Sequence, residues 1–338
     1  MQQNQKKSKV IQLSHGGGGQ EMNQLIQSLF LREFNNSILD SEEDAAVLKL
    51  NGLSAFTTDS FTVSPLFFSG GDIGKLAIAG TANDLSMMGA KPEYLSCGFI
   101  IEEGFAISDL KTIVRSMVDE MNICGAKIVC GDTKVVPKGS ADGIFINTSG
   151  IGSIQAKNIS IKNIELNDAI LVSRDIGRHG ATILMAREGL TLESNLTSDC
   201  AVLWPVIEQL IDAGINIHCM RDATRGGLAA VLNEWSSATN LEITIEEEAI
   251  PICEEVMGLC ELYGFDPLDL ANEGTCVFAI PQSDVEKALK IIRSTQQSPT
   301  ASVIGNVSAV GENVILKTPW GTSRYLDWPQ GELLPRIC

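Results

Sequence analysis

The sequence has few of the features that mark membrane proteins, secreted proteins and nucleic-acid-binding proteins. No apolar run approaches the roughly 18 residues that a membrane helix needs, and residues 1–9 are polar and basic with no apolar stretch behind them, so no secretory signal is expected. Lys and Arg number 25 against 42 Asp and Glu, a net charge of −17. So acidic a chain is not expected to bind a nucleic-acid backbone. We expect a soluble, cytoplasmic protein that binds neither nucleic acid nor membrane.

Several common catalytic and metal-binding patterns are also missing. The nine cysteines are odd in number and include no Cys-x-x-Cys pair, which disfavours a disulfide scaffold, a zinc ribbon and a thioredoxin-type site. The three histidines are scattered and form no metal-ligand pattern. We expect structural roles for His179 and His218, whereas His15 adjoins a glycine run and stays open. Gly-x-Ser-x-Gly and Walker-type phosphate loops do not occur.

The composition that is present is that of an ordinary globular protein. The chain has 338 residues, of which 44% are hydrophobic and 20% charged, and this length suggests two domains. The mix of strand-like and helical runs favours layered α/β or α+β domains. We predict four parts: a polar arm, an N-terminal domain, a C-terminal domain after a polar connection, and a flexible tail, over residues 1–13, 14–155, 168–318 and 319–338.

Hydrophobic periodicity predicts the following elements. Strands are expected over residues 46–50, 53–58, 94–101, 126–130, 144–151, 169–173, 241–246, 275–280, 301–305 and 313–317. Helices are expected over 22–30, 72–88, 108–122, 180–188, 200–213, 226–238, 252–262 and 283–295.

Acidic residues recur at element boundaries in the first half of the chain. They are Glu43-Asp44, Asp59, Asp84 and Asp132, each near Gly, Ser, Thr, Ala or Asn. Any one of them, taken alone, is more often part of a solvated rim. Four such positions meeting at one end of a sheet would suit Mg²⁺, which takes oxygen ligands and leaves room for phosphates.

Glycine-rich segments provide the complementary signal for an anion. Gly16–Gly19 and Gly70-Gly71 each precede a predicted helix, and Arg225-Gly226 opens another. Free amides and the helix dipole at such positions favour phosphate, although glycine is also the ordinary turn residue. Glu273 precedes an apolar strand, where it can serve as a general base, a metal ligand or a turn residue.

The chain ends in Pro335-Arg336-Ile337-Cys338, so the last residue carries a thiol. A thiol at a chain end is easily reached, and a flexible tail can carry it between an interior site and an outside partner. Residue chemistry alone leaves it open as a nucleophile, a carrier, an anchor or an incidental cysteine. A prenylation box is excluded because its cysteine lies four residues from the end.

These motifs together resemble the HypE family of hydrogenase maturation proteins. The matching segments are His15–Gly19, Thr57–Phe61, Gly70–Leu76, Asn83–Ala90, Gly131–Lys134, Arg221–Gly227, Asn272–Gly274 and Pro335–Cys338. The terminal Pro-Arg-Ile-Cys is the most specific of them. The internal motifs are shared more loosely with the wider PurM-type, ATP-dependent superfamily, which includes aminoimidazole ribonucleotide synthetase and thiamine-monophosphate kinase.

The resemblance implies a fold, an activity and partners. The fold is a two-domain PurM-like α/β fold, in which two N-terminal domains pair in a homodimer to form a shared β-barrel. The activity is that of a carbamoyl dehydratase, a carbon–oxygen lyase that uses ATP and Mg²⁺. The carbamoyltransferase HypF loads a carbamoyl group onto the terminal thiol, and the enzyme dehydrates it to a thiocyanate. The cyano group then passes to iron on the HypC–HypD complex as the cyanide ligand of [NiFe]-hydrogenase.

The resemblance also assigns roles to individual residues. Cys338, Lys134 and Glu273 are the expected catalytic residues, with Lys134 either a proton acceptor or a stabiliser of the transferring phosphoryl group. Metal binding is expected of Asp44, Asp59 and Asp84, and nucleotide binding of these three with Asp132, Gly70, Gly71, Arg225 and Gly226. One departure concerns the first pair, where the family has Asp-Asp-Ala and this chain has Glu43-Asp44-Ala45. The longer Glu43 makes its own role as a ligand less secure.

Two other classes of function stay open. One is a kinase or synthetase of the same superfamily that acts on a free small substrate. The selenophosphate synthetases carry a reactive residue near their N-terminal glycine loop, and no cysteine here precedes Cys97, which argues against that member. The other is a non-enzymatic thiol carrier.

Overall fold

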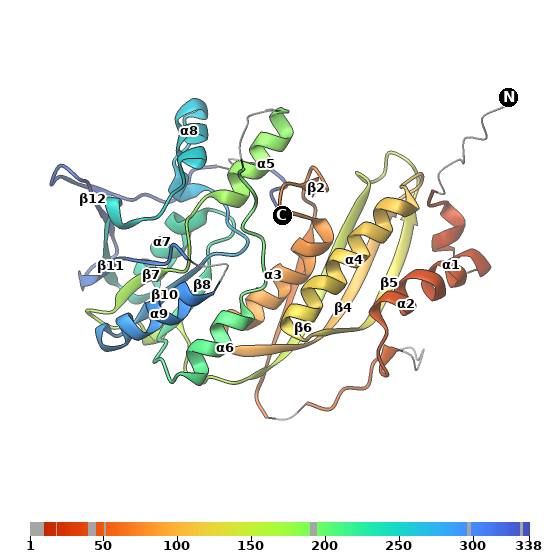
Figure 1. Cartoon of the computed structure of the whole chain (residues 1–338), viewed down its shortest axis with the longest axis horizontal. Helices are drawn as coiled ribbons and strands as arrows, with labels where there is room; N and C mark the ends of the chain where they lie inside the picture. Colours follow the sequence, from red (N-terminus) through yellow and green to blue (C-terminus); the bar gives the residue numbers. More distant parts are fainter. Residues whose placement is uncertain are drawn as a thin grey trace.

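The computed structural model describes residues 10–17, 19–39, 45–50, 52–189, 195–295, 299–331 and 334–338. Its first domain is built on a four-stranded sheet in the order β1-β6-β4-β5 (Figure 1). The strands are β1 (Ser54–Phe61), β6 (Ile144–Ile154), β4 (Ala90–Glu102) and β5 (Lys127–Val136). Between β1 and β4 in the chain, β2 (Phe67–Phe68) and β3 (Gly71–Asp72) form a separate two-stranded sheet. Strands β4 and β5 are parallel, and the other pairs in the sheet are antiparallel.

Helices cover one face of this sheet and leave the other open. The covering elements are α3 (Ile73–Met87), α4 (Ile107–Cys124) and the N-terminal run η1 (Leu13–Gly16), α1 (Gln20–Leu25), the π-helical η2 (Ile26–Leu31) and α2 (Arg32–Phe34). Residues of α3 such as Ile78 and Asn83 are almost fully buried. On the open face, Phe56 is 70% exposed and Ile100 is 44% exposed. The described part of the chain contains no closed barrel, so a shared barrel requires a second copy.

The second domain is a seven-stranded sheet with helices on both faces. Its strand order is β13-β12-β9-β11-β7-β10-β8. Strands β7 and β10 are buried along their whole length, as a two-sided core requires. The strands are β7 (Ala169–Val172), β8 (Cys219–Asp222), β9 (Leu241–Glu246), β10 (Cys276–Ile280), β11 (Ser302–Val310), β12 (Val314–Lys317) and β13 (Ser323–Tyr325).

Three helices of the second domain divide between the two faces of this sheet. Helices α6 and α9 pack with Leu171 and Phe278 on one face, and α7 packs with Val172 and Val277 on the other. The elements are α5 (Arg178–Glu188), α6 (Trp204–Asp212), α7 (Gly227–Thr239), α8 (Glu254–Tyr263) and α9 (Val285–Ser294), with short 3-10 turns η4 (Ile161–Asn163), η5 (Glu247–Ala249), η6 (Pro267–Asp269) and η7 (Gln282–Asp284).

A segment that is buried over residues 198–203 lies between the two domains and contacts both. Asn83 of α3 donates to the Ala201 carbonyl oxygen at 3.0 Å and accepts from the Leu203 amide at 2.7 Å. The Ser198 amide donates to the Ser69 carbonyl oxygen at 2.9 Å. One hydrophobic cluster also runs from the first domain into the second. These contacts fix the geometry of a site that lies between the domains.

The structure confirms the predicted α/β character and most helices, and corrects several details. No strand forms over residues 46–50, where Val47 is 90% exposed, because these apolar residues find no partner strand. Strand β8 was not predicted, since Cys219–Asp222 is short and half polar. Strand β13 lies in the segment predicted to be irregular, paired to β12 through a turn at Gly321. Ile11, in the predicted polar arm, is fully buried.

Gly274, two residues before β10, is required by close packing between backbones. A Cβ atom there would lie 1.9 Å from the Asp199 carbonyl oxygen, whereas a Cβ at Gly258 in α8 would meet nothing within 4 Å. We expect Gly274→Ala to lower the free energy of unfolding by about 2 kcal/mol or more, as overpacking does. The matched variant Gly258→Ala is expected to raise it by ~0.5 kcal/mol. Urea unfolding measures both, and equal stability of the two variants would contradict this account.

Candidate active site between the two domains

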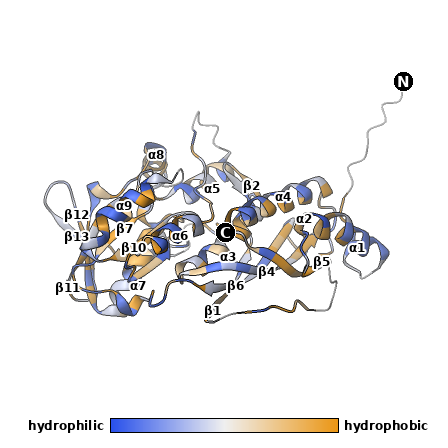
Figure 2. Ribbon diagram, turned by 60° about the horizontal axis from the view of Figure 1, so that its bottom comes forward, coloured by the Kyte–Doolittle hydropathy of each residue, from blue (hydrophilic) through white to orange (hydrophobic). Residues whose placement is uncertain are grey.

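The C-terminus lies in the middle of the molecule, between the two domains, rather than extending into solvent (Figures 1 and 2). The Thr62 amide donates to the Cys338 carbonyl oxygen at 3.0 Å, and the Thr62 hydroxyl donates to the same oxygen at 3.2 Å. The Ser64 amide donates to the Arg336 carbonyl oxygen at 3.3 Å. The tail is therefore docked against the stretch that follows β1.

Arginine side chains anchor this docked end. Arg336 donates from Nε to the Thr62 carbonyl oxygen at 2.8 Å and from Nη1 to Asp142 Oδ2 at 2.6 Å. Its guanidinium also lies over the Phe145 ring, 5.7 Å from the centroid. Arg187 of α5 donates to the Arg336 carbonyl oxygen at 2.6 Å. The arginine of the terminal motif thus ties the tail to the first domain.

The terminal thiol faces a small cavity of about 70 Å³ that both domains line. Burial, followed by the negative charge of Glu273, raises the pKa of Cys338 to about 12. A docked and unmodified thiol is therefore protonated and a poor nucleophile. The lining residues are Asp59, Ser60, Phe61, Gly80 and Asp84 from the first domain, Asp222, Thr224, Arg225 and Glu273 from the second, and Cys338.

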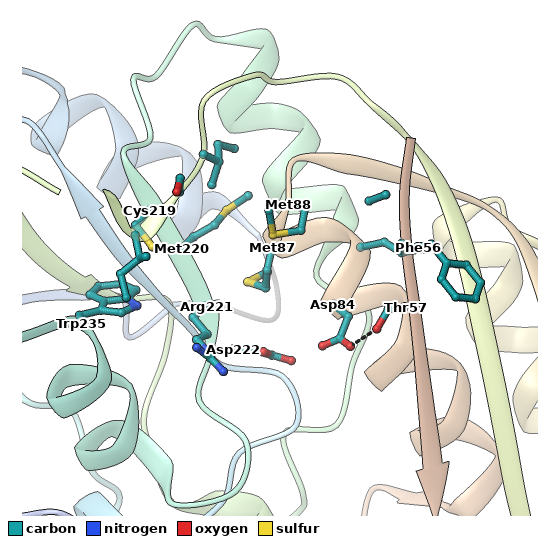
Figure 3. A pocket seen from close by; sticks show the side chains of 15 residues that line it. Phe56, Thr57, Asp84, Met87, Met88, Cys219, Met220, Arg221, Asp222 and Trp235 are labelled. Atoms are coloured by element: carbon teal, nitrogen blue, oxygen red, sulfur yellow. Dashed lines mark hydrogen bonds between the residues drawn. The ribbon is translucent and has the colours of Figure 1, made fainter. Parts of the chain in front are cut away.

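Three of these lining residues, Asp59, Asp84 and Asp222, are carboxylates that crowd one another. Burial and then the charge of Asp84 raise the pKa of Asp59 to about 6. The same two causes raise the pKa of Asp222 to about 7. The Thr57 hydroxyl donates to Asp84 Oδ2 at 2.6 Å, which orients that carboxylate (Figure 3). Three carboxyl groups this close together, of which Asp222 is buried and Asp59 and Asp84 are half-buried, favour a cation beside them.

Glu273 is held in the site by a second buried carboxylate that the motifs did not indicate. Asp199 accepts from the amides of Glu273 and Gly274 at 3.2 and 3.0 Å, and from the Thr275 hydroxyl at 2.9 Å. Glu273 itself is 2% exposed, and its Oε1 has no hydrogen-bond partner in the described part of the chain. Burial, followed by the charges of Asp222 and Asp199, raises the pKa of Glu273 well above its usual range.

A larger cleft of about 440 Å³ adjoins the thiol cavity. Its walls include Met87 and Met88 at the C-terminal end of α3, and Met220 and Trp235 from the second domain. Figure 3 shows Asp84 and Asp222 facing each other across it. The same two carboxylates also line the thiol cavity, so the cleft and the cavity share part of their walls. A cleft with apolar walls at one side and carboxylates at the other suits an extended ligand with an aromatic end and an end that binds cations.

The residues fit a divalent cation only in part. Asp59 and Asp84 lie together, but no three His, Cys, Asp or Glu side chains in the described ranges converge on one metal position. Asp44, the third expected metal ligand, and its neighbour Glu43 lie outside the described residues. Phosphate oxygens and water would have to complete such a site, as is usual for Mg²⁺ bound with a nucleotide.

Some of the expected site residues lie elsewhere. Asp132 and Lys134 pair with each other at 2.5 Å, on β5 and at the open face of the first sheet. Lys134 lines a different cavity, which shares Ser60 with the thiol cavity. The sequence therefore predicted a convergence of Asp132 with Asp59 that this chain alone does not form.

The glycine segments serve mainly close packing. Gly70 has φ +92°, and a Cβ there would lie 3.0 Å from the Ser198 backbone; Gly71 belongs to β3. The amides at the start of α3 are taken by Asp72, which accepts from Gly74 at 2.7 Å, so this helix start offers those amides to no anion here. Gly226, the N-cap residue of α7, has φ +78° and follows Arg225.

Several residues of the site were not singled out by the sequence. Asp222 falls within the Arg221–Gly227 motif, so the signal was present but was assigned to its arginines and glycines. Asp199, Thr62 and Arg187 carry no local signature. They act through backbone groups of other segments, which only the folded chain brings near.

The raised pKa of Asp222 predicts a pH dependence of stability without added cations. The folded pKa lies above the unfolded value, so the protonated carboxyl stabilises the fold, and this contribution is lost as the pH rises through about 7. Between pH 6 and 8 the wild type should lose ~1 kcal/mol more than Asp222→Asn, a neutral mimic. Urea unfolding in EDTA at both pH values measures this. Identical pH profiles of the two proteins would contradict it.

Comparison with known proteins defines the class. Residues 42–154 match the family model "AIR synthase related protein, N-terminal domain", and residues 166–317 match the model of its C-terminal domain. The fold is therefore the two-domain PurM-like α/β fold that the motifs predict. Within the described residues, no helix has both the length and the apolar character needed to cross a bilayer.

Closer relatives narrow this class to one family. The chain is 47% identical, over 97% of its length and 99% of the relative's, to carbamoyl dehydratase HypE of Escherichia coli (strain K12). A crystal structure of the hydrogenase maturation protein HypE in complex with ATP superposes with a TM-score of 0.93 at 44% identity, covering 97% of this chain and 99% of that one. A HypE–HypF complex matches with a TM-score of 0.80 at 49% identity, covering 90% and 99%. The chain belongs to the HypE family of carbamoyl dehydratases, as its motifs indicate.

Proposed function

We propose that this protein uses ATP and Mg²⁺ to dehydrate an S-carbamoyl group on its own Cys338 to a thiocyanate. The observation that carries the proposal is the docked tail. It places the terminal thiol in a carboxylate-lined cavity that shares Asp84 and Asp222 with a larger cleft. The ATP complex of the related HypE supports a nucleotide as the occupant of that cleft.

The shape of the site suggests how the nucleotide lies. The methionines and Trp235 offer an apolar surface for the base, while Asp84 and Asp222 lie between that surface and the thiol. Mg²⁺, when bound, neutralises the phosphates, and Asp59, Asp84 and Asp44 are the residues we propose to hold it. The positive charge of Arg225 opposes the rise in the pKa of Asp59 and of Glu273, so this charge acts on both carboxyl groups. We propose that it helps to hold the terminal phosphate.

The proposed chemistry converts a poor leaving group into a good one. The carboxamide oxygen attacks the terminal phosphorus of ATP, which releases ADP, and one proton leaves the nitrogen. The O-phosphorylated intermediate then loses phosphate as the C–O bond breaks, and the second nitrogen proton leaves as the C≡N bond forms. The oxygen lost from the carbamoyl group departs in the phosphate. The thiocyanate product is therefore lighter than the carbamoylated protein by one water.

Glu273 is the group we propose to accept a proton from the carbamoyl nitrogen. It lines the cavity around Cys338, and its unpaired Oε1 leaves a hydrogen-bonding position available. A raised pKa makes the carboxylate a stronger base once it is deprotonated. The neighbouring acids raise that pKa, so binding of cations beside them favours the deprotonated form.

The role that we propose for Lys134 requires a homodimer. Lys134 lies at the open face of the first sheet, where Ile100 and Phe56 are also exposed. Packing of two such faces into a shared barrel would bury Lys134 next to Ser60 and Thr62, beside the docked tail. Its role at the carbamoyl group therefore depends on the dimer.

The proposed partners follow from the chemistry of loading and delivery. The docked thiol is only partly exposed and is protonated, so we propose that the tail leaves the cavity to be carbamoylated. The related HypE–HypF complex supports HypF as the loading enzyme. We propose the HypC–HypD complex as the acceptor of the cyano group.

The mass of the C-terminal peptide tests the function directly. The protein is loaded with HypF, carbamoyl phosphate and ATP, and Mg²⁺-ATP is then added or withheld. The expected result is a gain of one carbamoyl group on the peptide that ends in Cys338, followed by loss of one water only with Mg²⁺-ATP. Loading without water loss would point to a carrier. No loading by an active HypF would point to a kinase or synthetase that acts on a free substrate.

A further inference from the structure

His179 of α5 contacts the docked tail directly, although its sequence context favoured a structural role alone. Its side chain is fully buried. Nε2 lies 2.8 Å from the Ile337 carbonyl oxygen, one residue before the reactive cysteine, and Nδ1 lies 2.8 Å from Ser198 Oγ. The Phe68 ring meets the imidazole in an edge-on contact, with the ring centroids 5.4 Å apart.

The hydrogen bonds determine which nitrogen carries the proton. A carbonyl oxygen only accepts, so Nε2 of His179 must donate to Ile337. Nδ1 then accepts from the Ser198 hydroxyl, whose oxygen in turn accepts from the Cys200 amide at 3.0 Å. Every polar atom of the neutral imidazole therefore has a partner. Burial also lowers the pKa of His179, which favours the same neutral form.

Ser198, the partner of His179 Nδ1, is itself held in place by hydrogen bonds to the first domain. Ser198 belongs to the segment between the domains, and its amide donates to the Ser69 carbonyl oxygen at 2.9 Å. The Ser69 hydroxyl donates back to the Leu196 carbonyl oxygen at 3.0 Å. His179 is therefore held in place by contacts to both domains. Its hydrogen bond is to the backbone of the tail and not to a side chain of the tail.

We propose that His179 is a positioning residue that holds the C-terminal tail in its docked state and so sets Cys338 beside Glu273. The part of this proposal that concerns dehydration rests on the proposed function. The part that concerns docking does not, because it needs neither ATP nor a carbamoyl group. Breaking the bond from His179 leaves the buried Ile337 carbonyl without this donor, which favours release of the tail.

Alkylation of the terminal thiol tests docking alone. Iodoacetamide is added without nucleotide, and the rate of modification of the peptide that ends in Cys338 is followed by mass. We expect His179→Leu to raise this rate about 10-fold, as loss of a buried hydrogen bond of ordinary strength implies. His179→Gln should bring the rate back near that of the wild type, because its side-chain amide nitrogen can donate at the Nε2 position.

Two comparisons keep the result unambiguous. His218→Gln alters the other histidine of the second domain, which bonds Asp168 rather than the tail, and it should leave the alkylation rate unchanged. Thermal unfolding of each variant shows whether it is folded. If His179→Leu does not fold, Ser198→Ala, which removes the partner of Nδ1, should still raise the rate by a smaller factor. Equal rates in the wild type and in the folded variants at residues 179 and 198 would overturn the proposal.

A second readout separates positioning from a general loss of structure. Loading by HypF uses the released tail, so His179→Leu should load at least as fast as the wild type. Its dehydration step should slow about 10-fold and recover in His179→Gln. Slower loading and slower dehydration together, without rescue by glutamine, would mean that His179 acts only through the fold.

Discussion

Replacement of Cys338 by alanine is expected to abolish both carbamoyl loading and the ATP-dependent loss of water. The proposed reaction occurs on its sulfur, and no other atom of the docked end can replace it. The fold and the docked position should survive, because Thr62 holds the backbone carbonyl of residue 338 and Arg187 holds that of residue 336. Peptide mass after incubation with HypF, carbamoyl phosphate and Mg²⁺-ATP measures the loss, and binding of ATP should be unchanged.

The chain offers matched controls for this variant. Cys130 and Cys253 are also partly exposed free cysteines, outside the thiol cavity. Cys130→Ala and Cys253→Ala should load and dehydrate as the wild type does. A carbamoyl group found on either residue, or thiocyanate formation retained in Cys338→Ala, would refute the assignment of the terminal thiol.

Glu273→Gln is expected to stop the reaction at the carbamoylated intermediate. A positioned general base contributes roughly 10²–10⁴-fold to rate, so dehydration should slow by that factor while loading continues. Glutamine has nearly the shape of the protonated carboxyl that burial favours at this position. The variant should therefore fold and dock its tail normally. The measurement is the single-turnover rate of water loss from the C-terminal peptide after Mg²⁺-ATP is added to the loaded protein.

Glu120→Gln is the matched control for this second variant. Glu120 is also a buried carboxyl with a raised pKa, caused first by burial, and its Oε2 also has no hydrogen-bond partner among the described residues. It lies beside Lys75, at 3.6 Å, and outside the thiol cavity. Its substitution should change the dehydration rate by no more than about threefold, a small effect beside that of a general base. Equal losses in the two variants would mean that Glu273 acts through the charge balance of the interior.

The site residues that lie within short, contiguous sequence motifs could be predicted from the sequence. Asp59, Asp84, Glu273 and Cys338 lie within recognisable sequence motifs, and the structure brings all four to one cavity. Asp132 and Lys134 follow the same rule in sequence, yet they lie at the open face of the sheet. Strand alternation predicts that Asp132 and Lys134 lie on the same face of the sheet. It does not predict which of the two faces the helices cover.

The sequence by itself determined the α/β class, most helices and the family. These properties depend on short-range periodicity, on composition and on contiguous motifs, which a linear chain displays directly. Only the tertiary structure decided that the tail docks inside the molecule, that Asp222 and Asp199 complete the site, and that His179 bonds the tail. The physical reason is that these contacts join backbone groups and buried side chains distant in sequence. Ile337 and His179, for example, are 158 positions apart.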